Sequence, residues 1–286
     1  MKKKVVSVIF VLLFLFFIGV MDYPFISRLI NEHNQGQVVA EYDASISEMA
    51  KSEIKNELKR AKDYNISLLS GINKQVFPDS FDVESKGTPY YNSLLRATKN
   101  GVMATIEIPK IQVKLPVYHT TNEYALDNGV GHLEGSSLPI GGKSTHACLS
   151  AHRGLPSKRL FTDLDQIVVG DKFFITVYDR ILAYQVYDIE VVKPEEVEQL
   201  LINGERDLVT LITCTPYGVN SHRIYVHAKR VPYSDGDNND GPFNFLDFLK
   251  RWWWVIATIL LLAWLIFLLR RFNAKPAEPA NNKKEQ

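Results

Sequence analysis

The sequence predicts a mostly β domain, either a closed barrel or a sandwich, with a helical extension before it and a membrane-spanning helix near each end. Three observations lead to this prediction. Short runs rich in β-branched residues, separated by turn-forming stretches, occupy residues 101–233. An amphipathic pattern with helical spacing precedes them in residues 41–69. An unbroken apolar run lies near each end of the chain.

The composition is that of an ordinary globular protein and argues against one class of partner. The 286 residues include 33 Lys and Arg and 32 Asp and Glu, so the formal net charge is +1. Because there is no excess of basic residues, we expect no binding to nucleic acid. The length allows one domain of about 150–200 residues with appended segments.

The first apolar run occupies residues 5–21 and follows three lysines in residues 1–4. At about 1.5 Å per residue it nearly crosses a hydrocarbon core of about 30 Å. No small-x-small cleavage site follows the run, which favours an uncleaved signal-anchor. A signal peptide that is removed remains the alternative.

The second apolar run occupies residues 251–271, with three tryptophans at its start and Arg270 and Arg271 at its end. Tryptophans are typical of the membrane interface. Positive charges flank both runs on their terminal sides, so residues 1–4 and the tail 272–286 are expected in the cytoplasm. The chain between the two spans is then extracellular, anchored to the cell membrane, with residues 234–250 as a linker.

The segment 22–100 is predicted to be a helical extension. Ile46, Ile54, Leu58 and Ala61 fall on one stripe, which indicates a pair of amphipathic helices packed against the main domain. A membrane-surface helix is the alternative, and it is less favoured because the polar face carries both signs of charge.

The segment 101–233 has spacings suited to an antiparallel β domain. Turn-rich stretches at 129–132 and 138–142 interrupt it. Short helices are expected at 160–164 and 194–201. Strands are expected at 103–108, 111–117, 145–151, 172–178, 183–192, 207–213 and 223–231.

Cys214 follows a β-rich run and precedes a turn containing Pro216 and Gly218. If the strands on either side of this turn pair as a hairpin, Arg223 returns close to Cys214. A guanidinium group there would favour the thiolate and could donate to an oxyanion. Two alternatives stay open on these residues: a Cys148–Cys214 disulfide, as expected outside the cell, and a purely structural Arg223 at a strand edge.

A cysteine nucleophile requires a histidine for proton exchange. His152 ends an apolar strand and opens a loop, so it occupies the same kind of strand–loop junction as Cys214. We expect His222 to project away from Arg223 and His227 to lie on the barrel surface. The remaining histidines are expected to be structural or solvated: His33, His119, His132 and His146.

Four stretches in order along the chain closely resemble the sortases, cysteine transpeptidases of Gram-positive cell surfaces: GVGHLEGSSLPIGG, THACLSAHRGLP, LFTDLD and TLITCTPYGVNSHR. The similarity runs from about residue 107 to residue 230. It implies an eight-stranded sortase-type β-barrel with Cys214 as nucleophile, His152 as general acid/base and Arg223 as the group that positions substrate and stabilises the oxyanion. It also implies cleavage of an LPXTG-like sorting signal after its threonine, through a thioacyl-enzyme.

The C-terminal span and the N-terminal extension resemble class C, the sortases that polymerise pilins. In that class the resolving amine is a pilin lysine, so the expected partners are pilin subunits bearing LPXTG-like sorting signals. The resemblance implies no cofactor and no metal, and we expect the catalytic domain to be a monomer. The alternatives are a sortase that anchors surface proteins to peptidoglycan and, more distantly, a non-catalytic membrane scaffold with a sortase-like barrel.

Class C sortases carry a lid in which an Asp-Pro-aromatic tripeptide covers the active site. The nearest match is Thr88-Pro89-Tyr90, so residues 88–90 are a possible lid. Tyr90 could pack against the thiol, whereas Thr88 replaces the aspartate and cannot pair with Arg223. An ordinary surface turn is the alternative. Within the resemblance Cys148 is expected to be a buried free thiol that acts as a small hydrophobe.

Overall fold

The computed structural model describes residues 2–70, 86–234 and 245–273. The chain divides into two compact units: a barrel unit, residues 26–241, and a terminal unit, residues 1–25 with 242–286. The predicted tail 272–286 and linker 234–250 lie largely outside the described residues. The domain boundaries predicted from the sequence remain predictions.

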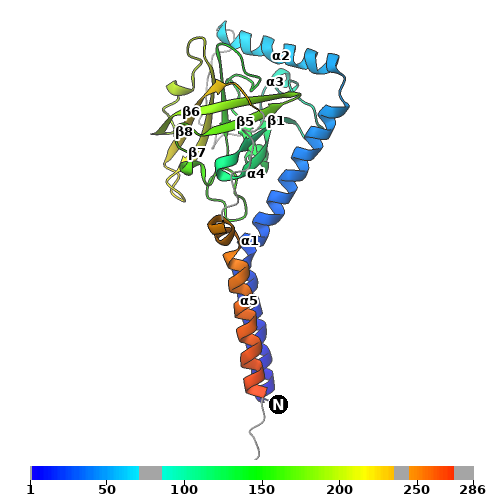
Figure 1. Ribbon diagram of the computed structural model, residues 1–286, viewed down its shortest axis with the longest axis vertical. Helices are drawn as coiled ribbons and strands as arrows, with labels where there is room; N and C mark the ends of the chain where they lie inside the picture. Colours follow the sequence, from blue (N-terminus) through cyan, green and yellow to red (C-terminus); the bar gives the residue numbers. More distant parts are fainter. Residues whose placement is uncertain (1, 71–85, 235–244, 274–286) are drawn as a thin grey trace, which may run out of the picture. The chain divides into compact units, whose positions relative to one another are not determined.

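Eight strands close into one barrel in the order β1-β2-β3-β4-β7-β8-β6-β5, which confirms the predicted fold class (Figure 1). The pairs β2–β3 and β4–β7 run parallel, so the barrel is mixed and not wholly antiparallel as expected. The strands are β1 Val102–Ile108, β2 Val113–His119, β3 Val130–His132, β4 Thr145–Ser150, β5 Lys172–Val177, β6 Arg180–Val192, β7 Asp207–Thr215 and β8 His222–Val231.

Three local predictions were wrong. The stretch 129–132, predicted as a turn, contains strand β3, which was missed because it has only three residues, one of them glycine. The helix expected at 160–164 is replaced by turns and the 3-10 helix η2, Leu164–Gln166, since Leu160 has a φ of 44°, outside the helical region. The helix expected at 194–201 is reduced to the single 3-10 turn η3, Glu198–Leu200.

Side chains on β8 alternate between the two faces of the barrel wall, as expected for a strand. Ile224 and Val226 belong to the main core inside the barrel. Tyr225 faces outward, yet it is buried in a second apolar cluster on the outer face, which we call the outer cluster. The outer cluster consists of Leu133, Cys148, Val192, Leu200, Ile212 and Tyr225.

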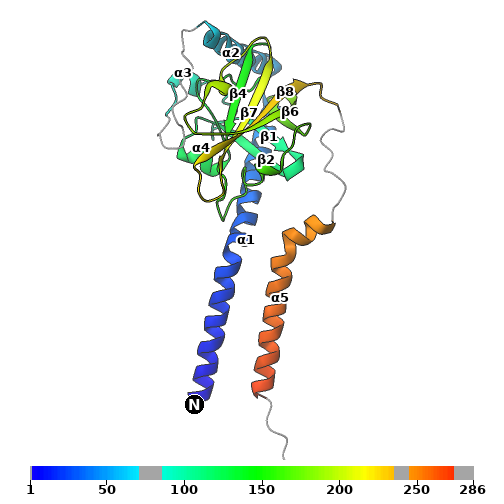
Figure 2. The same ribbon diagram turned by 90° about the vertical axis from the view of Figure 1, so that its left-hand side faces the viewer.

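The predicted pair of amphipathic helices is confirmed by the end of α1, Lys2–Glu48, and by α2, Lys51–Leu69. The buried Tyr42 on α1 donates its hydroxyl to the Met103 carbonyl at 3.2 Å and accepts from the Tyr178 amide at 2.9 Å. On α2 the Asn65 side chain exchanges two hydrogen bonds with the Leu138 backbone, at 2.8 and 3.1 Å. These contacts fix α2 across one end of the barrel (Figures 1 and 2).

Three further short helices connect the elements of the barrel unit. They are α3, Pro89–Asn92, the 3-10 helix η1, Pro109–Ile111, and α4, Glu123–Asn128. The helix α4 is capped at its N-terminus by Asn122, whose side chain accepts from the Ala125 amide at 2.9 Å. This cap fixes the start of α4, the helix that connects β2 to β3.

The terminal unit contains the first part of α1 and helix α5, Phe245–Asn273. Two helices are long and apolar enough to cross a membrane, within Val8–Glu48 and Trp252–Arg271. Inside this unit Phe25 stacks on Trp254 with ring centroids 5.2 Å apart, and Thr258 Oγ1 lies 2.9 Å from Asp22 Oδ1. These apolar helices are consistent with anchoring of the chain in a membrane.

Candidate active site

Cys214 is on β7 and Arg223 is on the neighbouring strand β8, while His152 follows the end of β4, the other neighbour of β7, by two residues. In the parallel pair the last partners are Ser150 and Ile212, and the Ala151 amide continues the ladder by donating to the Ile212 carbonyl at 3.2 Å. When this register is continued by two residues, His152 lies opposite Cys214. Adjacent strands lie about 4.8 Å apart, so these two side chains start from neighbouring positions.

The hairpin expected from the sequence is also present. Cys214 and Arg223 are paired residues of the antiparallel β7–β8 ladder, so their side chains leave the same face of the sheet. This face is the outer one that carries the outer cluster. His152, Cys214 and Arg223 therefore form one row across three strands, which we call the catalytic row.

The catalytic row is shielded from solvent. Cys214 is 8% exposed and Arg223 is 6% exposed, while His152 is only partly buried. The Arg223 guanidinium donates through Nη1 to the carbonyls of Asn220 and His222, at 3.1 and 3.2 Å, which orients it within the β7–β8 turn. A cation held in this way beside a nearly buried thiol can stabilise a thiolate or an oxyanion.

The histidine of the row lies in an environment that favours its neutral form. Burial lowers the pKa of His152 below its usual 6.5 as the largest effect, while the Asp127 carboxylate raises it and the Lys158 ammonium lowers it. Lys158 Nζ donates to the Asp127 backbone carbonyl at 2.7 Å and lies 3.8 Å from Asp127 Oδ2, so these two charges are held together. A neutral imidazole at neutral pH can accept a proton.

Both cysteines are free thiols, so the disulfide alternative is excluded. Cys148 pairs with Thr210 in the β4–β7 ladder, four residues before Cys214 along β7. Four residues of a strand span about 13 Å, far beyond the separation that a disulfide permits. Cys148 is buried within the outer cluster, where burial strongly raises the pKa of its thiol.

Arg153 is a residue that the sequence analysis missed. Its side chain is 8% exposed and joins the loop after β4 to the end of β7. Nη1 donates to Thr215 Oγ1 at 3.1 Å, Nε donates to the Thr162 carbonyl at 3.2 Å, and Nη2 pairs with Asp165. Arg153, which directly follows His152, is therefore hydrogen-bonded to Thr215, which directly follows Cys214.

A glycine allows the histidine loop to pack on the β7–β8 turn. Gly154 has a φ of +83°, and a Cβ atom there would lie 3.2 Å from the Tyr217 ring. Any other residue would be strained and would press on that ring. The signal in the sequence is the Arg153-Gly154 pair after His152, but its partners on β7 become visible only when the strands are in register.

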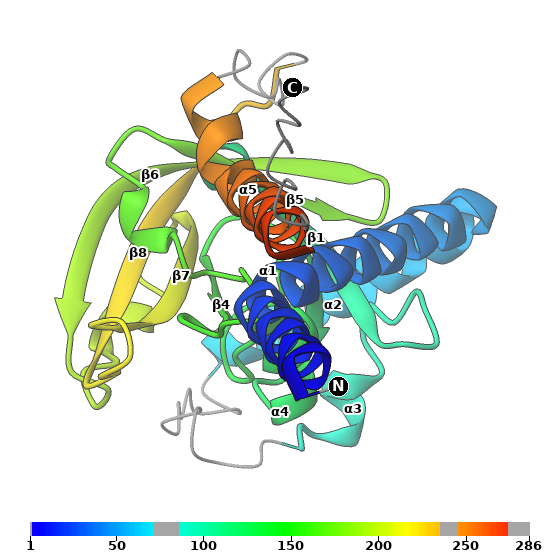
Figure 3. The same ribbon diagram turned by 90° about the horizontal axis from the view of Figure 1, so that it is seen from below.

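The possible lid, Thr88-Pro89-Tyr90, lies at the start of α3. Thr88 Oγ1 accepts from the Tyr91 amide at 3.3 Å, and the Thr88 amide donates to Glu134 Oε1 at 2.9 Å. Tyr90 is 53% exposed, and its ring lies 6.4 Å from that of Tyr64. In Figures 1 and 3 α3 lies across the barrel from β7 and β8. The lid role remains a prediction.

Most of the other histidines have structural roles, as expected, but one expectation was wrong. His132 is fully buried, with Nδ1 hydrogen-bonded to the Tyr91 hydroxyl at 2.7 Å. His227, expected on the surface, is only 4% exposed, because the rings of Tyr187, Tyr225 and His146 lie about 6 Å from its own ring. It joins a buried chain in which Thr210 Oγ1 lies 2.7 Å from His146 Nε2 and 2.8 Å from His227 Nδ1.

Metal binding has no obvious location in the part of the chain that the structure describes. Among those residues no group of three His, Cys, Asp or Glu side chains is arranged to hold a metal ion.

Comparison with known proteins agrees with this arrangement. The sortase domain family matches residues 106–231. The curated relatives include sortase A of Streptococcus agalactiae, 28% identical over 187 residues that cover 64% of this chain and 70% of the relative. They also include sortase A of Bacillus anthracis, 30% identical over 133 residues that cover 46% of this chain and 61% of the relative.

Solved structures extend the match beyond the barrel. Sortase C1 from S. agalactiae is 44% identical, with a TM-score of 0.62, and the match covers 69% of this chain and 100% of that one. Sortase C from S. pneumoniae is 39% identical, with a TM-score of 0.64, and the match covers 72% of this chain and 100% of that one. The chain belongs to the sortase family of cysteine transpeptidases, and the solved structures it resembles are class C sortases.

Proposed function

We propose that this sortase polymerises pilins: it cleaves an LPXTG-like sorting signal after the threonine, holds the acyl group on Cys214 and transfers it to a pilin lysine. The observation that carries this proposal is the catalytic row, in which Cys214 lies between His152 and Arg223. The similar sortase C of S. pneumoniae is described as having pilin substrate specificity, and this favours a pilin as the substrate here.

In the acylation step the Cys214 sulfur attacks the carbonyl carbon of the threonine. The bond from carbon to sulfur forms, and the bond from carbon to the next residue's nitrogen breaks. His152, carrying a proton taken from the thiol, donates it to the departing amine. The product is a thioester that keeps the acyl group activated without ATP.

In the transfer step the lysine amine attacks the thioester carbonyl. His152 accepts the proton that the amine loses, and the Cys214 thiolate leaves. Arg223 donates to the oxyanion in both steps, and its two hydrogen bonds to backbone carbonyls keep the guanidinium oriented before substrate arrives. Burial of the row strengthens these electrostatic interactions.

A second function is favoured by the curated relatives named sortase A. In this alternative the enzyme anchors surface proteins to peptidoglycan, and a cell-wall peptide amine replaces the pilin lysine. The two functions differ only in the nucleophile accepted, so the row itself does not separate them.

The separating experiment incubates the full chain, in detergent micelles, with a purified pilin subunit. Covalent multimers that form a ladder on a denaturing gel are expected, and a pilin whose acceptor lysine is changed to arginine should form none. Cys214→Ala should abolish the ladder. A sorting-signal product formed only when a peptidoglycan peptide is added would support the anchoring alternative, and a ladder formed by Cys214→Ala would refute the mechanism.

A further inference from the structure

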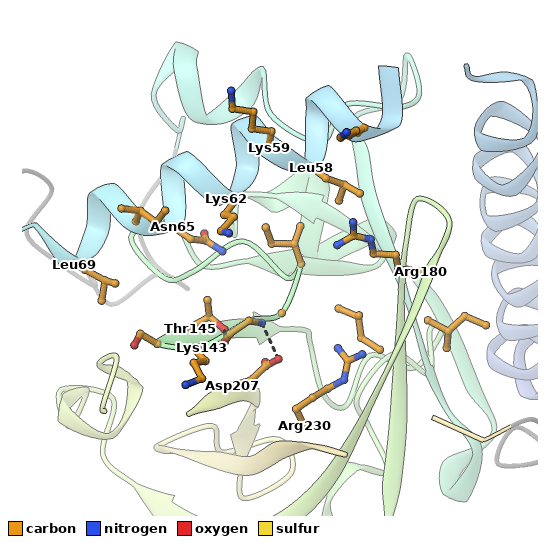
Figure 4. A pocket seen from close by; sticks show the side chains of 18 residues that line it. Leu58, Lys59, Lys62, Asn65, Leu69, Lys143, Thr145, Arg180, Asp207 and Arg230 are labelled. Carbon is orange, nitrogen blue, oxygen red and sulfur yellow. Dashed lines mark hydrogen bonds between the residues drawn. The ribbon is translucent and has the colours of Figure 1, made fainter. Parts of the chain in front are cut away.

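A groove separate from the catalytic row opens between α2 and the adjoining rim of the barrel (Figure 4). Its volume is about 1060 Å³. The barrel side includes the loop before β4 and the start of β7 at Asp207. The residues from the β5–β6 region that line the groove are at the start of β6, from Arg180, and Arg230 near the end of β8 lines it as well. Asp207 and Cys214 are near opposite ends of β7, about 23 Å apart along the strand. The groove is therefore independent of the site described above.

The lining of the groove is strongly cationic. Its single acidic residue, Asp207, is already occupied, because its carboxylate accepts from the Gly142 amide at 2.7 Å and the Tyr184 hydroxyl at 2.9 Å. Six basic residues line the groove: Lys55, Lys59, Lys62, Lys143, Arg180 and Arg230. Lys143 pairs with Glu205 at 3.2 Å, but within the described ranges the three α2 lysines that line the groove and Arg180 form no ion pair.

The charges of α2 are divided between its two flanks. The lysines at 55, 59 and 62 follow helical spacing along the flank that faces the groove. Glu53 and Glu57 lie on the opposite flank, where Glu57 pairs with Arg60 at 2.6 Å. The sequence shows only a polar face of both signs, whereas the folded helix presents one sign to the groove.

Apolar side chains accompany these cations. Ile66 on α2 is 52% exposed and Ile181 on β6 is 37% exposed, and both line the groove. Figure 4 shows Lys62 reaching down from α2 and Arg180 reaching from the barrel into the same space. A pure polyanion would use the cations and leave these isoleucines exposed to water. An acidic polypeptide with aliphatic side chains would use both kinds of group.

We propose that this groove is a docking site for an extended acidic segment of a partner protein. Its carboxylates pair with Lys62 and Arg180, and its aliphatic side chains cover Ile66 and Ile181. Charge complementarity of this kind speeds association and selects the partner, and the apolar contacts add affinity. The site does not depend on the transpeptidation mechanism.

The test measures fluorescence anisotropy of a short labelled peptide that alternates glutamate with valine, added to the full chain in detergent micelles. The double variant Lys62→Glu with Arg180→Glu should weaken binding by about tenfold or more, because two attractive contacts become repulsive. The matched control, Lys51→Glu with Lys99→Glu, makes the same change of net charge outside the groove and should leave the affinity within about twofold.

A third variant distinguishes a peptide from other anions. Ile66→Ser should weaken binding of the peptide and leave binding of inorganic polyphosphate unchanged, because only the peptide has aliphatic side chains to bury. Cleavage of a short sorting-signal peptide should proceed at the normal rate in every groove variant, which keeps this test separate from that of the proposed function. Equal losses in the two double variants, or tighter binding of polyphosphate or of anionic lipid vesicles than of the peptide, would overturn the proposal.

Discussion

Two buried histidines should make this fold sensitive to mild acid. His132 and His146 are almost fully buried, and burial lowers the pKa of each from 6.5 to about 4. Below pH 6.5 the unfolded chain binds a proton at these positions that the folded chain excludes until about pH 4. Their stabilising contribution is therefore fully present above pH 6.5 and is lost as the pH falls toward 4.

The size of the effect follows from the two pKa values. At pH 5 the unfolded imidazole is almost fully protonated and the folded one is mostly neutral, so each histidine contributes about 2 kcal/mol less stability than at pH 8. Together the pair should lower the free energy of unfolding by about 4 kcal/mol, a large part of the roughly 5–15 kcal/mol typical of a domain.

The assay is urea unfolding of the full chain in detergent micelles, followed by circular dichroism at pH 8 and pH 5. His132→Gln and His146→Gln should each reduce the difference between the two pH values by about 2 kcal/mol, whatever their effect at pH 8. His33→Gln removes an exposed imidazole and should leave the difference unchanged. If His132→Gln and His146→Gln keep the full pH dependence of the natural chain, the reasoning from burial is refuted.

Three other predictions concern the catalytic row. Arg153→Lys removes the hydrogen bond to Thr215 and should lower kcat for a sorting-signal peptide about tenfold with little change in KM. An unchanged kcat, measured by product formation, would show that the bond between Arg153 and Thr215 does not position the row. Gly154→Ala should destabilise the domain by about 1–2 kcal/mol in a urea titration, and wild-type stability would contradict the strain assigned to its positive φ. If Pro89 and Tyr90 act as a lid, Tyr90→Ala should raise the rate at which an alkylating reagent labels Cys214, read by mass spectrometry. An unaltered rate, in keeping with the exposed position of Tyr90 beside Tyr64, would remove them as a lid.

The parts of the site that depend on local spacing were predictable from the sequence. Cys214 and Arg223 flank a single turn, so a hairpin alone brings them together, and the ladder has them as partners. His152 was different. Its position next to Cys214 depends on the parallel pairing of β4 with β7, and β5 and β6 lie between these two strands in the sequence. Residue spacing made His152 only one of several candidates, and the resemblance to sortases selected it.

The errors have a common physical origin. His227 alternates outward along β8, so the strand period alone placed it on the surface. Rings from other strands, those of His146 and Tyr187, lie against His227 in the folded barrel, and no local pattern encodes that packing. Arg153 was missed for the same reason, since its partners Thr162, Asp165 and Thr215 are separated in sequence and meet only in the folded barrel.

The parallel pairing of β4 with β7 has a consequence for the time at which the thiol becomes reactive. The hairpin of β7 and β8 can form early from local contacts, but the β4–β7 ladder must close a loop that includes all of β5 and β6. During folding Cys214 therefore lies beside Arg223 before His152 reaches its position next to Cys214. If His152 is the proton-transfer partner of Cys214, as proposed, that partner is in place only when the barrel has closed. Acyl transfer would then be restricted to molecules that have finished folding.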